Sequence, residues 1–98
     1  MNIEYTGRSA NAASEMDLKN AFTAAQAYFN DFPNGVIDLE KLKQNGFVPS
    51  DGVRLVIFSG ERGSLSMKAY PQAGCGCVYY VDSEGEIEYR ETENNVSD

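Results

Sequence analysis

The pattern of hydrophobic and polar residues divides the chain into a helical half followed by a half made of strands. From Ser9 to Asp31 the apolar residues recur at the i, i+3, i+4, i+7 spacing of one helix face. The stripe consists of Leu18, Ala21, Phe22, Ala25, Phe29 and Phe32. Because Pro33 disfavours helical backbone at the residue before it, we expect the helix to end near Asn30 or Asp31.

A short second helix is predicted over Leu39 to Asn45. Asp38 precedes it and is a preferred N-cap residue, and Gly46 follows it as a residue suited to the C-terminal turn. Phe47 can then fold back on the last turn of this helix.

After Gly52 the apolar period changes from that of a helix to that of strands. Strands are predicted at residues 53–58, 64–70, 77–81 and 86–90. In the second of these, Leu65, Met67 and Ala69 share one face, which we expect to pack on the helix stripe. In the last, Ile87 and Tyr89 are predicted to point inward.

The order of these elements predicts an α+β fold, because helices and strands are segregated along the chain. We expect one domain, residues 1–98, in which a long N-terminal α-helix packs on a small antiparallel sheet of three to four strands. Its length of 98 residues suits a single hydrophobic core. Residues 91–98 have no periodicity and are predicted to form a disordered tail.

The charge distribution excludes several classes of function. The chain carries a net charge of −7, and residues 82–98 hold seven acids against one base. Nucleic-acid binding needs clustered Lys and Arg, so no nucleic-acid partner is expected. Histidine is absent, which removes the usual general base, the Ser-His-Asp triad and the commonest nitrogen ligand of metals. We therefore expect no enzyme, no cofactor and no metal.

The two cysteines stand at Cys75 and Cys77, with Gly76 between them. Residues two apart in a strand are separated by ~6.6 Å, so a disulfide between the pair would be strained. Two structural thiols, free or paired, are one interpretation, and a redox-active pair is another. A zinc half-site is disfavoured because the chain has no second pair and no histidine.

An acidic segment, Asp82-Ser83-Glu84-Gly85-Glu86, places three carboxylates within five residues. Calcium needs six to eight oxygen ligands in an ordered array, and this spacing fits no complete EF-hand loop. We favour a solvated hairpin turn in which the glycine supplies a positive φ.

Several short segments also follow one another in an informative order. They are Tyr5–Arg8 with Ser9–Ala13, Asp17–Ala21, Ala27–Pro33, Leu39–Phe47 and Pro49–Val53. Through this series, from about Tyr5 to Tyr70, the chain resembles the globular part of a bacterial type IV pilin. The pseudopilins of type II secretion share that fold, but the calcium loop typical of the major pseudopilins is not evident, which favours a pilus subunit.

The resemblance implies a non-enzymatic structural subunit of a bacterial surface filament, supplied from a precursor pool anchored in the inner membrane. Its partners would be other pilin subunits, reached through the N-terminal helix, and it would meet the membrane only through an apolar half-helix missing from this sequence. Residues 1–8 would then be a helix extension, with Met1 either a recombinant start or the start of a naturally split pilin. The alternative outside the filament class is a secreted or periplasmic binding or redox module that uses Cys75 and Cys77.

On this hypothesis the two sides of the first helix have different functions. The core face is Leu18, Phe22, Ala25 and Phe29, and the filament-packing face is Ala12, Met16, Thr23 and Ala27. The second face carries few charges apart from Lys19 at its edge, whereas a face that only contacts solvent usually carries more. We therefore expect neighbouring helices to pack against it in the filament.

Overall fold

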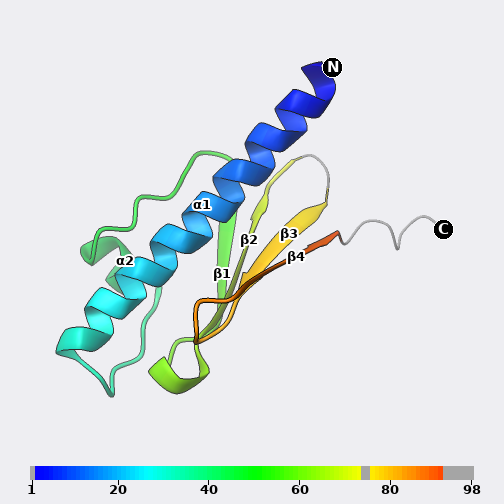
Figure 1. Ribbon diagram of the computed structural model, residues 1–98. Coiled ribbons are helices and arrows are strands. Elements are labelled where there is room, and N and C mark those ends of the chain that lie inside the picture. The colour runs from blue at the N-terminus through cyan, green and yellow to red at the C-terminus, as the bar shows by residue number, and fades with distance from the viewer. Residues whose placement is uncertain (1, 74–75, 92–98) are drawn as a thin grey trace.

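The computed structural model describes residues 2–73 and 76–91, with side chains for residues 12–73 and 76–90. Two helices precede four strands along the chain (Figure 1). The elements are helix α1 (Asn2–Asp31), helix α2 (Leu39–Gln44), strand β1 (Val53–Ser59), the 3₁₀ turn η1 (Arg62–Ser64), and strands β2 (Ser66–Pro71), β3 (Cys77–Val81) and β4 (Ile87–Glu91). The predicted α+β class is confirmed.

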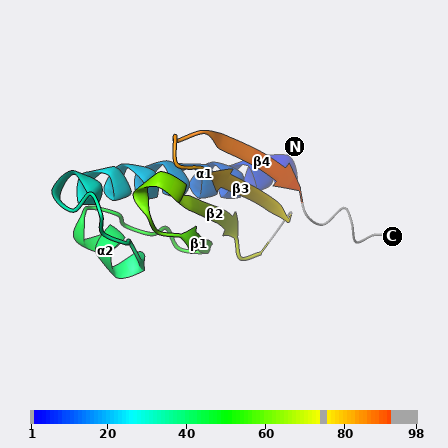
Figure 2. The ribbon, with the colours of Figure 1, turned by 90° about the horizontal axis from the view of Figure 1, so that it is seen from below.

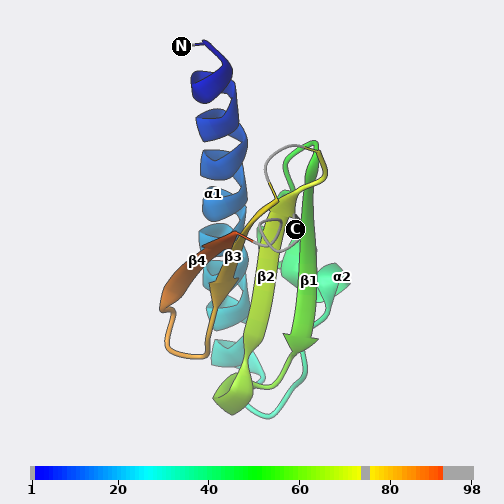
Figure 3. The same cartoon turned by 90° about the vertical axis from the view of Figure 1, so that its right-hand side faces the viewer.

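The strands form one antiparallel sheet in the order β1-β2-β3-β4, so each strand pairs with its neighbour in sequence. Leu55 lies opposite Ala69, Met67 opposite Val81, and Val81 opposite Ile87. This register places the alternating apolar residues of all four strands on the same face. Helix α1 covers that face, and α2 lies closer to β1 than to β4 (Figures 2 and 3).

The core lies between α1 and the inner face of the sheet. Its buried members are Leu18, Ala21, Ala24, Ala25, Phe29, Ile37, Leu42, Phe47, Leu65, Met67, Ala69 and Val81. The three residues of the predicted strand 64–70 that were expected to meet the helix, Leu65, Met67 and Ala69, are all in this cluster. Phe22 is only partly buried and packs at its margin.

Helix α1 begins at Asn2, seven residues before the start predicted at Ser9. No proline interrupts Asn2–Arg8, and the single Gly7 is a weak breaker, so the helix continues through this segment. Its N-terminal turns extend past the end of the sheet (Figures 1 and 3). Within the described residues, no helix combines the length and hydrophobicity that crossing a membrane requires.

The second helix follows its predicted signals. Asp38 is the N-cap, and its side chain accepts a hydrogen bond from the backbone N–H of Lys41 at 2.9 Å. The backbone N–H of Phe47 donates to the carbonyl of Leu42, and the Phe47 ring is buried. The chain therefore folds back on α2 after Gly46, as predicted.

Two predicted core residues are exposed. Phe32 is 57% exposed because α1 ends at Asp31, so Phe32 no longer follows the helix stripe; its ring lies against Tyr28 at 5.1 Å. Tyr89 was expected to point into the core but is 45% exposed. It lies on edge strand β4, and its ring contacts Tyr79 at 5.1 Å, the residue opposite it in β3.

Two segment boundaries also differ from prediction. The second strand was expected to start at Ser64, but Arg62–Ser64 forms the 3₁₀ turn and β2 starts at Ser66. The register shifts between Ile57 and Ser59, where the β1 end of this hairpin is irregular. At the other end Glu91, placed in the predicted tail, is the last residue of β4. The rest of that tail, 92–98, lies outside the described residues.

Candidate functional site

The outward face of α1 is the first candidate site. All four residues of the predicted filament-packing face, Ala12, Met16, Thr23 and Ala27, are exposed. Met16 is 57% exposed, which is high for a large apolar side chain. The Thr23 hydroxyl donates to the carbonyl of Lys19 at 3.1 Å within the helix. The hydroxyl therefore has a partner already, and the face needs no external hydrogen bond there.

The charges beside this face neutralise one another. Lys19 Nζ lies 3.7 Å from Glu15 Oε2, an i, i+4 pair on the surface of the helix. Glu15 also influences the sheet beneath it: burial raises the pKa of the Tyr79 hydroxyl, and the nearby Glu15 carboxylate raises it further. Next to this ion pair, the face itself presents small or flexible uncharged side chains.

The opposite face of α1 is held by packing. Leu18, Ala25 and Phe29 of the predicted core face are buried, and Phe22 lies partly buried under the β3–β4 turn. Gly85 of that turn has φ +84°, and a Cβ there would lie 3.0 Å from the Phe22 ring. Glycine therefore lets the turn close directly onto the helix.

A buried carboxylate gives α1 a polar anchor that the sequence pattern did not reveal. Asp17 is almost fully buried, and its carboxylate accepts hydrogen bonds from the Ser50 backbone N–H at 2.9 Å and from the Ser50 hydroxyl at 2.7 Å. Ser50 lies in the loop that leads into β1. A single Asp inside a helix gives no sequence signal of such a partner, because the partner is defined only by the fold.

Cys77 lies at the start of β3, where it is 2% exposed and disulfide-bonded. Cys75 is the other cysteine of the chain and lies outside the described residues, so the pairing of these two cysteines stays a prediction. Redox-active cysteines are usually partly accessible. The burial of Cys77 favours a structural role.

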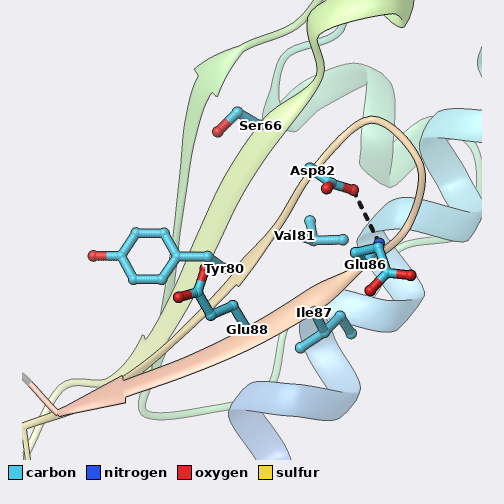
Figure 4. A pocket seen from close by; sticks show the side chains of 7 residues that line it. All are labelled: Ser66, Tyr80, Val81, Asp82, Glu86, Ile87 and Glu88. Atoms are coloured by element: carbon cyan, nitrogen blue, oxygen red, sulfur yellow. Dashed lines mark hydrogen bonds between the residues drawn. The ribbon is translucent and has the colours of Figure 1, made fainter.

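The acidic segment after β3 forms the β3–β4 turn (Figure 4). Asp82 Oδ1 accepts from the backbone N–H groups of Glu84 at 2.9 Å and Glu86 at 3.0 Å. Such side-chain to backbone bonds are typical of Asx turns. One carboxylate therefore organises the turn, and in the described parts of the chain no group of three acidic or cysteine residues could hold a metal.

An open hollow of about 420 Å³ lies beside this turn, on the sheet face that α1 does not cover. It is lined by Ser66, Tyr80, Val81, Asp82, Glu86, Ile87 and Glu88. Three carboxylates and a phenol surround it, and within the described residues no basic side chain lines it.

The fold and these surfaces define a small α+β domain, in which one helix covers an antiparallel meander and presents an uncharged outer face. No family model, curated protein or solved structure matches the chain.

Proposed function

We propose that this chain is a structural subunit of a type IV pilus or a related bacterial filament, and that it packs against neighbouring subunits through the outer face of α1. In this role the sheet holds the helix in place, and the helix forms the contact between subunits. A pseudopilin of type II secretion would use the same surface.

The observation that carries the proposal is the exposure of Ala12, Met16, Thr23 and Ala27 on a helix that extends past its own sheet. Small side chains allow two helix backbones to approach closely. A face that carries few charges, with Lys19 at its edge, is also unusual on a surface helix that contacts only water.

The opposite side of the helix supports the same assignment. Asp17 and the core face bind the loop and the sheet, so the domain does not need the outer face for its own stability. One side of the helix is therefore used for folding, and the other is available for assembly.

The direct test uses cells that express the chain from its own gene. Filaments are sheared from the cell surface and probed with an antibody against the chain. We expect the chain in the sheared fraction, and we expect Ala27→Glu to remove it from that fraction while the cellular level of the protein stays unchanged.

A matched control is Gln44→Glu, which adds the same charge at an exposed position of α2, away from the outer face of α1. It should leave the sheared fraction intact. The proposal fails if the wild-type chain is absent from the sheared filaments, or if the two variants assemble equally well.

A further inference from the structure

The face of the sheet that points away from α1 is a second uncovered surface (Figure 3). In the antiparallel register, Arg54 of β1, Lys68 of β2 and Tyr80 of β3 lie on this face, because they alternate with the inward residues Leu55, Met67 and Val81. Glu88 of β4, which lies opposite Tyr80, is on the same face, so all four strands contribute to it. No described helix crosses its centre (Figure 3).

Aromatic rings and cations alternate over its centre. Phe58 is 56% exposed and stacks on Tyr80 with ring centroids 6.5 Å apart. Lys68 Nζ lies 5.6 Å from the Phe58 ring and 5.3 Å from the Tyr70 ring, and the Arg90 guanidinium lies 5.5 Å from the Tyr80 ring. These contacts hold the long basic side chains flat along the rings. The centre of the face is thus ordered, partly apolar and able to pack.

The charges of this face differ at its two ends. Arg54 lies near the start of β1, at the end of the sheet where β2 finishes. Asp82 and Glu86 lie at the opposite end, where β3 turns into β4 and where they line the hollow with Tyr80. Arg90 is paired with Glu88 at 2.9 Å, but among the described residues Arg54 and Lys68 form no ion pair. One end is therefore basic and the other acidic.

We infer that this outer sheet face is a contact surface for a second copy of the chain, in a face-to-face dimer related by a twofold axis. Arg54 on β1 and Glu86 on the β3–β4 turn lie at diagonally opposite corners of the face. A twofold axis that lies in the contact plane and crosses the strands obliquely therefore places each Arg54 over the Glu86 of the other copy. The aromatic rings of Phe58, Tyr70 and Tyr80 then lie between the two charged corners. A twofold contact is self-complementary by symmetry, and this face meets that requirement.

A ligand whose charges all have the same sign fits the face less well than a second copy of the chain does. An acidic peptide would meet the Glu86 end, and a basic one would meet the Arg54 end, with repulsion in each case. Elsewhere the chain is strongly acidic, so most other contacts between two copies are repulsive. This sheet-face contact is separate from the packing through α1 proposed above. It is measured on the isolated chain, whereas filament assembly is measured on cells, so either proposal can fail while the other holds.

The test is a charge swap between two variants. Arg54→Glu gives two acidic pairs in its own homodimer, and Glu86→Arg gives two basic pairs in its own. We expect each variant alone to self-associate about tenfold more weakly than wild type, because like charges facing each other are strongly unfavourable. In an equimolar mixture, the heterodimer has one native pair and one reversed pair, both complementary. The mixture should therefore regain the wild-type dissociation constant.

Sedimentation equilibrium over a wide concentration range measures the dissociation constants of wild type, of each single variant and of the equimolar mixture. Lys43→Glu and Asp31→Lys serve as matched controls, since they make the same charge changes at exposed positions away from this face. They should behave as wild type. The inference is overturned if wild type shows no association beyond that of the single variants, if the mixture is no tighter than its components, or if association continues past the dimer.

Discussion

Asp17 of helix α1 and Ser50, 33 residues later in the chain, are joined by two hydrogen bonds that tie the helix to the loop before β1. Both donors belong to Ser50, and the Asp17 carboxylate accepts them while almost fully buried. The pair connects the helical half to the strand half at a place where apolar packing alone does not specify the path of the loop.

Asp17→Ala leaves the Ser50 N–H and hydroxyl without their acceptor. An unsatisfied buried group costs about 1–3 kcal/mol, and we expect a loss of that size in the free energy of unfolding. Urea denaturation followed by circular dichroism measures it. Ser50→Ala keeps the backbone bond and should cost less than Asp17→Ala. Equal stability of Asp17→Ala and wild type would contradict the anchoring role.

Two phenylalanines of the helix stripe differ in how deeply they are buried, and therefore in their expected contribution to stability. Phe29 is fully inside the core, so Phe29→Ala should destabilise the domain by about 3–5 kcal/mol. Phe22 is only partly buried, and Phe22→Ala should cost less. Thermal unfolding of the two variants provides the comparison, and a larger loss for Phe22→Ala would show that the helix is docked in another orientation.

Two alanines two residues apart distinguish the faces of α1. Ala27→Glu places a charge on the exposed face and should change the free energy of unfolding by less than about 0.5 kcal/mol. Ala25→Glu buries an unpaired carboxylate in the core and should cost more than about 3 kcal/mol. If Ala27→Glu is the variant that unfolds in a thermal scan, the outer-face assignment is wrong.

Tyr79 should make stability depend on pH at the alkaline end. Its pKa is raised above 10.0, first by burial and then by Glu15, so the folded state holds the phenol proton more tightly than the unfolded state does. Its stabilising contribution is complete below pH 10.0 and decreases as the pH rises through the folded pKa.

Tyrosinate absorbance measures this titration as the difference between wild type and Tyr79→Phe. Glu15→Gln removes the repelling charge and should lower the Tyr79 pKa part of the way, with burial still holding it above the ordinary value. No change in the Tyr79 titration on Glu15→Gln would exclude the electrostatic contribution.

Local signals in the sequence were sufficient to predict most of the helices and strands. The apolar period, Pro33 and the Asp38 cap predicted where α1 ends and α2 begins, because these signals act through local backbone geometry. Alternation in residues 64–70 identified the inward residues Met67 and Ala69, since side chains in a strand point to opposite faces in turn. The 3.6-residue period of a helix likewise identified the outward residues Ala12, Met16, Thr23 and Ala27 of α1.

The contacts that these helices and strands make with one another depend on the tertiary structure. Phe32 belongs to the stripe by spacing but is exposed, because the helix ends one residue earlier. Tyr89 alternates correctly but lies on an edge strand with a neighbour on one side only. The partner of Asp17 and the separation of charge between Arg54 and Glu86 depend on residues far apart in the chain. Such relationships follow from strand register and helix docking, which no local pattern encodes.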